Sequence, residues 1–141
     1  MKVLVLNGPN LNMLGLREPE LYGKGTYADL ETFVSETASR LGIEVEMRQT
    51  NHEGTLVDWI QQSRGVFDAI VLNAAAYTHT SVAVLDALKA VKARCVEVHL
   101  TDPKTREEFR HVSYIRAACI GTIRGHGLSG YLEALHLLCN R

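Results

Sequence analysis

Apolar runs of strand length alternate with helix-like segments along the whole chain, and this alternation constrains the fold more than any other feature. The five apolar runs lie at residues 3–6, 43–47, 69–72, 95–100 and 119–123. The segments that follow them have helical spacing, except for a short helical turn after the fourth run, and they cover residues 26–41, 55–64, 80–91, 102–109 and 128 onward. This β-α order, repeated five times, predicts parallel strands linked by crossover helices.

The apolar runs differ in how far they are buried. Val3–Leu6 and residues 69–72 are continuously apolar, as expected of central parallel strands that are covered on both faces. Residues 43–47 alternate between apolar and charged side chains, which indicates a half-exposed strand at an edge. We therefore predict a three-layer α/β fold with a doubly wound, five-stranded parallel sheet of flavodoxin type.

Capping residues mark the ends of the predicted helices. Thr26 has Asp29 three residues later, which is the spacing of a capping box, and Gly42 stands where a helix ends. Thr80 or Ser81 caps the helix that ends near residue 91. Pro103 suits the first position of the turn at 102–109.

Length and composition favour a single domain over residues 1–141 and argue against several classes of partner. The length of 141 residues is close to the commonest domain size, and 46% hydrophobic residues are enough for a sizeable core. A net charge of -1 does not favour nucleic acid or an anionic membrane as a partner, and no apolar run approaches a membrane span. We expect the three cysteines (Cys95, Cys119 and Cys139) to be small buried hydrophobes in a cytoplasmic protein.

Polar side chains gather where the predicted strands end, and in such sheets ligands bind beyond those ends. They are Asn7, Asn10 and Asn12 after the first strand, Gln49, Asn51, His52 and Glu53 after the second, Asn73, Thr78, His79, Thr80 and Ser81 after the third, Glu97, His99, Thr101 and Asp102 at the fourth, and Arg124 and His126 after the last. Caps and turns alone explain any one of them. Their convergence on one edge predicts a polar site.

Several familiar chemistries lack their motifs. The sequence has no Walker A loop, no dinucleotide fingerprint after the first strand and no Gly-x-Ser-x-Gly elbow. The histidines lack metal-ligand spacing, so we expect neither a metal nor a cofactor. Acid–base chemistry on a small polar molecule remains.

The connection at residues 11–25 is the most unusual segment. Loops longer than about 12–15 residues tend to be lids or binding loops. This one carries Arg17 and Tyr22. Without further context, a solvated loop with a tyrosine packed on the surface is the favoured explanation.

Six motifs, in order along nearly the whole chain, resemble type II 3-dehydroquinate dehydratase. They lie at residues 7–12, 17–23, 49–54, 77–83, 97–99 and 106–114. The resemblance implies dehydration of 3-dehydroquinate to 3-dehydroshikimate by anti elimination through an enolate, in the shikimate pathway of aromatic amino acid (chorismate) biosynthesis or in quinate breakdown. It also implies a homododecamer built from trimers.

The resemblance implies these catalytic roles. Tyr22 abstracts the proton beside the ketone, and Arg17 supports the tyrosinate. His99 protonates the departing hydroxyl, and Glu97 orients His99. Asn10 helps to stabilise the enolate.

The resemblance further implies that six residues hold the substrate, with one of them reaching a neighbouring subunit's site. These are Asn73, His79, Leu100, Thr101 and Arg110, together with Asp86 at the subunit contact.

The energetics of Tyr22 call for more than one cation. A free tyrosine has a pKa of about 10, so ionising it at pH 7 costs about 4 kcal/mol. One cation at ~4 Å supplies roughly that amount before desolvation is counted. We therefore expect Arg110 or Arg106 to lie near Tyr22 in addition to Arg17.

Some positions depart from the family pattern. Ala75 stands in a segment that usually carries glycine, and Asp102 stands in place of asparagine. Arg124 and His126 replace small or apolar residues. The alternative to an enzyme is a non-catalytic, flavodoxin-like small-molecule binding domain.

Overall fold

Five parallel strands form one sheet in the computed structural model, which describes residues 1–16 and 25–140. The strands are β1 (Lys2–Asn7), β2 (Glu44–Gln49), β3 (Ala69–Asn73), β4 (Cys95–His99) and β5 (Gly121–Arg124). Their order is β2-β1-β3-β4-β5, and every neighbouring pair is parallel. The flavodoxin-like, doubly wound sheet expected from the sequence is confirmed, with β2 at an edge.

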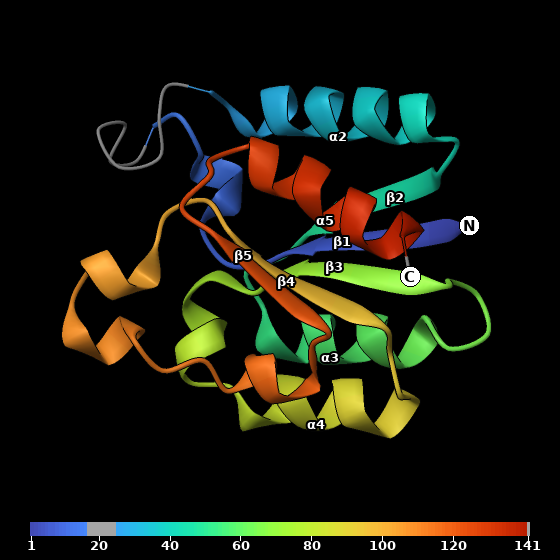
Figure 1. The fold of residues 1–141 in the computed structure, drawn as a ribbon. Helices are drawn as coiled ribbons and strands as arrows, with labels where there is room; N and C mark the ends of the chain where they lie inside the picture. Colours follow the sequence, from blue (N-terminus) through green and yellow to red (C-terminus); the bar gives the residue numbers. More distant parts are fainter. Residues whose placement is uncertain (17–24, 141) are drawn as a thin grey trace.

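Helices cover both faces of the sheet and make three layers (Figure 1). One face carries α2 (Tyr27–Leu41) and α5 (Ser129–Cys139), and the other carries α3 (Glu53–Gln62) and α4 (Val82–Val91). Each face buries its own apolar cluster, one centred on Val5 and Val71 and the other on Leu6 and Leu72. Adjacent strand residues point to opposite faces, so the continuously apolar strands supply both clusters.

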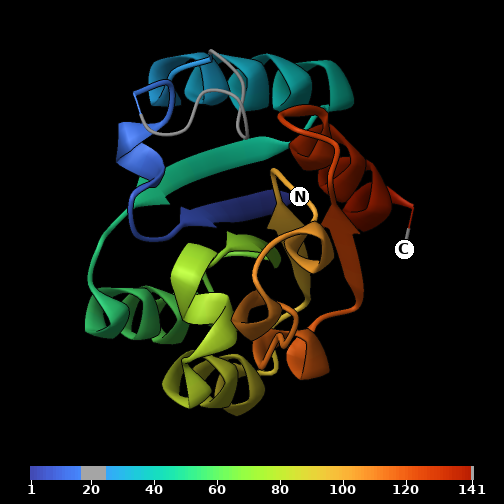
Figure 2. The same ribbon diagram turned by 90° about the vertical axis from the view of Figure 1, so that its left-hand side faces the viewer.

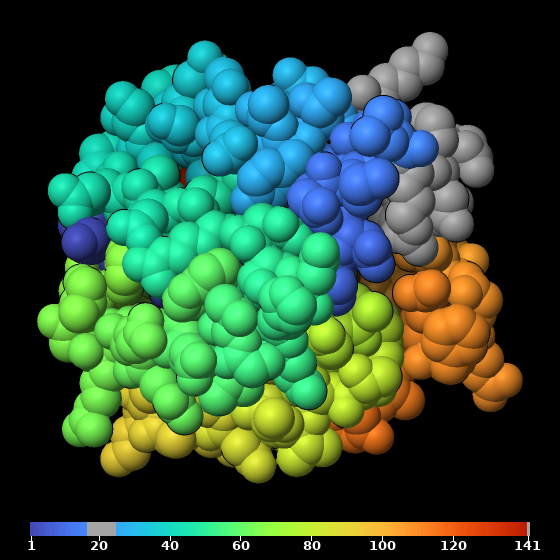
Figure 3. All heavy atoms as spheres, turned by 180° about the vertical axis from the view of Figure 1, so that it is seen from behind, coloured from blue at the N-terminus to red at the C-terminus, as the bar shows by residue number. Residues whose placement is uncertain are grey.

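The predicted caps form as expected. The Thr26 hydroxyl accepts from the backbone N–H of Asp29 at 3.2 Å, and the backbone N–H of Thr26 donates to Asp29 Oδ2 at 2.9 Å. Gly42 ends α2 at φ 70°, where glycine has no Cβ penalty. Ser81 caps α4 by accepting from the backbone N–H of Val84 at 2.9 Å. From behind, α2 and α3 flank the edge strand β2 (Figure 3).

Two predicted boundaries were wrong. Helix α3 begins at Glu53, two residues before the predicted start. Strand β5 begins at Gly121 because residues Ile115–Ala118 form a 3-10 turn, η5, and the Cys119 thiol folds back to donate to the Ile115 carbonyl at 3.3 Å. The predicted turn at 102–109 consists of two 3-10 turns, η3 (Pro103–Thr105) and η4 (Glu108–Arg110).

The prediction of three buried cysteines holds only for Cys95. Cys119 is half-buried and Cys139 is exposed. The buried face of α5 runs through Tyr131, Leu135 and Leu138. Cys139, one residue after Leu138, lies off this face and is exposed to solvent.

No helix within residues 1–16 and 25–140 is long and apolar enough to cross a membrane.

Short connecting segments surround the carboxyl edge of the sheet (Figure 2). The turn η1 (Leu11–Met13) follows β1, η2 (Ala75–His79) follows β3, and η3 and η4 follow β4. Parallel strands therefore bring these connections to one end of the molecule.

Candidate active site

A cavity of about 190 Å³ opens at the carboxyl edge of the sheet, a size suited to a small molecule. Seven of the residues predicted from the sequence line it: Asn10, Asn73, His79, His99, Leu100, Thr101 and Arg110. Pro9, Leu11, Met13, Leu14, Ala75, Ala76, Pro103 and Arg106 complete the lining. The strand ends therefore do converge on one site.

The floor of the cavity lies at the carboxyl ends of β1 and β3, the neighbouring strands between which the strand order switches. Asn7 and Asn73 are register partners there. The Tyr131 hydroxyl donates to Asn7 Oδ1 at 2.6 Å and accepts from Asn73 Nδ2 at 3.0 Å. Asn73 Oδ1 also accepts from the backbone N–H of Ala75 at 3.2 Å. These bonds fix the orientation of the Asn73 amide at the edge of the cavity.

Asn10 lies at a backbone position that favours its residue type. Its φ is 70°, a left-handed conformation that asparagine adopts more readily than most residues. Its backbone N–H donates to Asn51 Oδ1 at 3.0 Å, and Gln49 Nε2 donates to the same oxygen at 3.1 Å. The turn that presents Asn10 is thus tied to the segment that follows β2.

Glu97 and His99 form a buried pair on β4. They are two residues apart, so both side chains lie on one face of the strand. His99 Nε2 lies 2.5 Å from Glu97 Oε2. Because a carboxylate can only accept, Nε2 carries the proton of this bond, and Nδ1 remains to exchange a proton with a molecule in the cavity.

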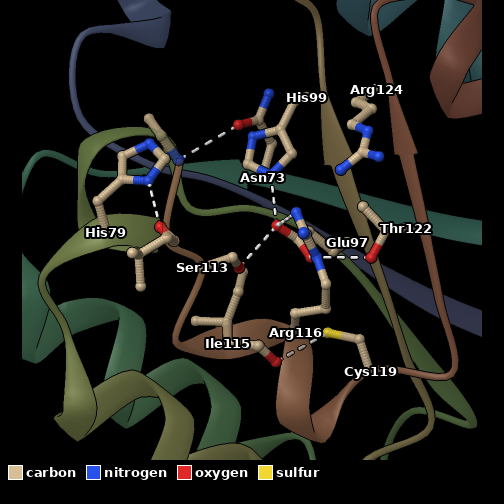
Figure 4. A network of polar contacts seen from close by, with 12 residues as sticks. Asn73, His79, Glu97, His99, Ser113, Ile115, Arg116, Cys119, Thr122 and Arg124 are labelled. Atoms are coloured by element: carbon tan, nitrogen blue, oxygen red, sulfur yellow. Dashed lines mark hydrogen bonds and ion pairs between the residues drawn. The ribbon is translucent and has the colours of Figure 1, made fainter. Parts of the chain in front are cut away.

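Four side chains saturate the Glu97 carboxylate (Figure 4). Besides His99, Arg116 Nε donates to Oε1 at 2.9 Å, Ser113 Oγ to Oε2 at 2.9 Å and Thr122 Oγ1 to Oε1 at 3.0 Å. Burial alone would raise the pKa of Glu97, but the bonds from His99, Arg116 and Ser113 outweigh it and lower that pKa to about 2. Glu97 is therefore an anion at neutral pH.

His79 presents an unprotonated nitrogen to the cavity. Its Nδ1 lies 2.7 Å from the Val112 carbonyl oxygen, so this nitrogen is the donor. Burial lowers the pKa of His79, and the nearby His99 and Arg110 act in the same direction. The two imidazoles stack with ring centroids 6.4 Å apart. A neutral His79 can accept a hydrogen bond through Nε2.

Two arginines enter the cavity from the segment after β4. Arg110 Nε donates to Glu107 Oε2 at 3.0 Å, and Arg106 Nε lies 3.9 Å from Glu107 Oε1. A hydrogen bond from its own backbone N–H, and then the bond and charge of the nearby arginines, hold the pKa of the Glu107 carboxyl below its usual range. Both candidates for the second cation, Arg110 and Arg106, therefore line the cavity, whereas Tyr22 lies outside the described residues.

Asp102 and Arg124, two departures from the family pattern, lie against each other. Arg124 Nε is 3.8 Å from Asp102 Oδ1, and the same carboxylate oxygen caps η3 through the backbone N–H of Lys104 at 3.0 Å. Asp102 is therefore the N-cap of η3. The third departure, His126, pairs with Glu133 at 2.5 Å on the surface. The Arg124–Asp102 pair offsets the negative charge added beside the site.

Ala75, the remaining departure, adopts φ 53°. This left-handed conformation costs an L-residue with a Cβ about 1–2 kcal/mol, whereas glycine adopts it freely. The physical reason for a glycine in this segment is therefore the backbone conformation, and the Ala75 methyl group adds to the lining of the cavity.

Four predicted site residues are not among the described residues that line this cavity. Glu97 reaches the site only through its bond to His99. Asp86 is exposed on α4 and does not line the cavity. Arg17 and Tyr22 lie outside the described residues. Within 1–16 and 25–140, no three His, Cys, Asp or Glu side chains are grouped as metal ligands would be.

Four residues that fix the site were not predicted from the sequence: Tyr131, Ser113, Arg116 and Thr122. Thr122 carried the clearest signal, since it is a polar residue in an apolar strand run beside a strand with a glutamate. Tyr131 shares the buried helical spacing of Leu135 and Leu138. Arg116 lies in a segment that we assigned to no element, so nothing in the local pattern pointed to it.

The comparisons with known proteins agree with this geometry. The model of the family described as dehydroquinase class II matches residues 1–139. The chain belongs to this family.

Relatives of this dehydroquinase family match over almost their whole length. The 3-dehydroquinate dehydratase of Geotalea daltonii is 54% identical over 140 residues, covering 99% of this chain and 97% of the relative. Two crystal structures of type II dehydroquinases superpose closely on the structure of this chain. The enzyme from Butyrivibrio crossotus has a TM-score of 0.97 at 46% identity, and that from Propionibacterium acnes has 0.95 at 45%, each covering 99% of this chain and 97% of its own.

Proposed function

We propose that this chain is a hydro-lyase that removes water from 3-dehydroquinate to give 3-dehydroshikimate, in the shikimate pathway. Membership of the dehydroquinase class II family supports the reaction. The observation that carries the proposal is the buried Glu97–His99 pair, whose imidazole lies at a polar cavity of small-molecule size.

Tyr22 is the proposed base. It removes the proton beside the substrate ketone, and the electron pair of that C–H bond moves to the carbonyl oxygen as an enolate. Arg17, with Arg110 or Arg106, offsets the charge of the tyrosinate. Asn10, held by its turn at the cavity mouth, stabilises the enolate oxygen as a neutral donor.

His99 is the proposed acid. As the enolate reforms its carbonyl and the carbon–carbon double bond forms, the C–O bond to the hydroxyl breaks, and His99 donates a proton so that water departs. Tyr22 has gained a proton and His99 has lost one, so returning a proton from the tyrosine to the imidazole through solvent closes the cycle. Glu97 holds the imidazole in the required tautomer.

The remaining lining residues bind the substrate. A neutral His79 accepts from a substrate hydroxyl, while Asn73 and Thr101 offer polar groups. Arg110 provides positive charge for the substrate carboxylate. Leu100 shapes the wall between them.

We further propose a cytoplasmic homododecamer built from trimers, in which Asp86 reaches the site of a neighbouring subunit. The exposure of Asp86 on α4 supports this role. Analytical ultracentrifugation of the native protein tests it. A species of twelve chains is expected, and a monodisperse monomer with full activity would contradict it.

The activity is tested by ultraviolet absorbance, because the product is a conjugated enone and the substrate is not. Purified oligomer mixed with 3-dehydroquinate should produce this absorbance, and borohydride should not inactivate the enzyme in the presence of substrate. Absence of product would refute the function. Inactivation by borohydride would indicate a Schiff base and a different mechanism.

A further inference from the structure

Arg116 lies behind the proposed acid and does not line the cavity. It comes from η5, whereas Glu97 comes from β4, and it contacts both carboxylate oxygens. Nε donates to Oε1 at 2.9 Å and Nη2 to Oε2 at 3.3 Å. The Arg116 side chain keeps 36% of its exposure, while Glu97 has none. The Arg116 guanidinium therefore binds a fully buried carboxylate while the Arg116 side chain itself remains partly exposed to solvent.

We propose that Arg116 is a positioning residue for the dehydration: it fixes the Glu97 carboxylate against His99 and, by its charge, lowers the proton affinity of the Glu97–His99 pair, so that the pair releases its proton more readily. This inference rests on the proposed function, since it assigns His99 the role of acid.

The geometry supports a role in positioning. Glu97 Oε2 accepts hydrogen bonds from His99, Ser113 and Arg116. Glu97 Oε1 accepts hydrogen bonds from Arg116 and Thr122. Arg116 is the one group among these that binds both oxygens, so it defines the plane of the carboxylate (Figure 4). A forked, planar guanidinium is suited to this because both of its bonds are held in one plane.

The charge supports a role in acidity. An isolated Glu97 anion would hold the proton of His99 strongly. The Arg116 cation, bound to the same carboxylate, offsets part of its negative charge and so weakens the attraction between Glu97 and the His99 proton. Removing this cation raises the proton affinity of the Glu97–His99 pair as a whole, whichever of the two groups carries the proton. The direction of the expected effect is therefore fixed.

Other charged or titratable groups around His99 stay constant in the test. Among the described residues they are His79 on η2, Arg106 and Arg110 at the cavity, Arg124 on the neighbouring strand, and Cys95 and Cys119 near Glu97.

Thr122→Val is a matched control for Arg116→Gln. Thr122 donates to the same oxygen, Oε1, at nearly the same distance, yet it carries no charge. Arg116→Gln should move the His99 limb of the kcat–pH profile to higher pH by about one unit and lower kcat at pH 7 by about tenfold. Thr122→Val should lower kcat less and leave the limb in place. A His99 limb at the same pH in Arg116→Gln and Thr122→Val would overturn the proposal.

Arg116→Lys separates charge from orientation and guards against a Gln variant that fails to fold. Lysine should restore the limb to within a few tenths of a unit, because the charge remains, while kcat stays below the parent value, because the fork is lost. A limb in the Lys variant shifted as far as in the Gln variant would rule out the charge effect.

A second readout does not depend on turnover. Diethyl pyrocarbonate modifies the unprotonated imidazole, so the pH dependence of His99 modification, followed by mass spectrometry of its peptide, should show the same shift in Arg116→Gln oligomer. If the modification profile of His99 shifts in Arg116→Gln but the parent protein does not turn over 3-dehydroquinate, the role of Arg116 stands and the proposed function is refuted. If the parent protein turns over 3-dehydroquinate but the profile does not shift, the proposed function stands and the role of Arg116 is refuted.

Discussion

At the scale of single residues, the site departs from its family at positions whose physical consequences the structure makes explicit. Ala75 accepts a left-handed backbone, and Asp102 is offset by Arg124. Neither change alters the Glu97–His99 pair.

Ala75→Gly should raise the free energy of unfolding by about 0.5 kcal/mol, since relief of the left-handed strain exceeds the entropy that glycine adds to the unfolded chain. Ala76→Gly, in the same turn but at negative φ, should lower it by about 0.5 kcal/mol or more. Urea denaturation at fixed protein concentration measures both. Equal destabilisation by the two changes would show that no strain is stored at Ala75.

Arg124→Leu should raise KM for the anionic substrate about two- to fivefold with little change in kcat, because Asp102 loses its partner beside the site. Asp102→Asn combined with Arg124→Leu should return KM to near the parent value. The effect of the single change should shrink in high salt. Steady-state kinetics at two salt concentrations provide the test, and a KM unaffected by Arg124→Leu would contradict it.

At the scale of elements, close approach of β1 and β3 beyond the switch point places the cavity floor. Gly8 N donates to the Asn73 carbonyl at 2.8 Å. A Cβ at Gly8 would lie 2.4 Å from the Ala74 carbonyl oxygen, which is a backbone atom and cannot move aside.

Gly8→Ala should therefore lower the melting temperature by several degrees and kcat/KM at least tenfold, because the turn carrying Asn10 must shift. Gly54→Ala is the matched control. A Cβ there meets nothing within 4 Å, and alanine favours the helix in which Gly54 lies. Gly54→Ala should leave activity intact and stability equal or higher. A Gly8→Ala enzyme with parental stability would refute the close approach.

The elements also show how far sequence reasoning reaches. Periodicity and caps predicted the sheet, the edge position of β2 and the capping box at Thr26, because these depend on neighbours in the chain. The start of β5 was missed because Cys119 bonds back to Ile115, a contact that has no periodic signal. Glu97 and His99 were predicted as a pair because the family resemblance implies it. Arg116 was not, since its partner lies 19 residues away.

At the scale of the whole molecule, the buried Glu97 links the site to acid stability. Its pKa is lowered in the folded protein from 4.5 to about 2. A depressed carboxyl pKa stabilises the fold above the unfolded value and loses that contribution as pH falls toward the folded one. Up to about 3 kcal/mol of unfolding free energy should therefore be lost between about pH 4.5 and pH 2.

Urea denaturation across this range, at fixed protein concentration, measures the loss. In Arg116→Gln the folded pKa of Glu97 should be higher, so less stability remains to be lost below pH 4.5. A parent protein whose stability is flat from pH 5 to pH 2 would contradict an ionised, bonded Glu97.

The most direct test of the central claim is turnover of 3-dehydroquinate by Tyr22→Phe, set beside its binding of a substrate analogue. Phenylalanine removes only the hydroxyl, so the account predicts that the ultraviolet signal of the enone is abolished while the analogue binds within a few-fold of the parent affinity. Turnover at the parental rate, or loss of binding to the same degree as turnover, would mean that Tyr22 is not the base.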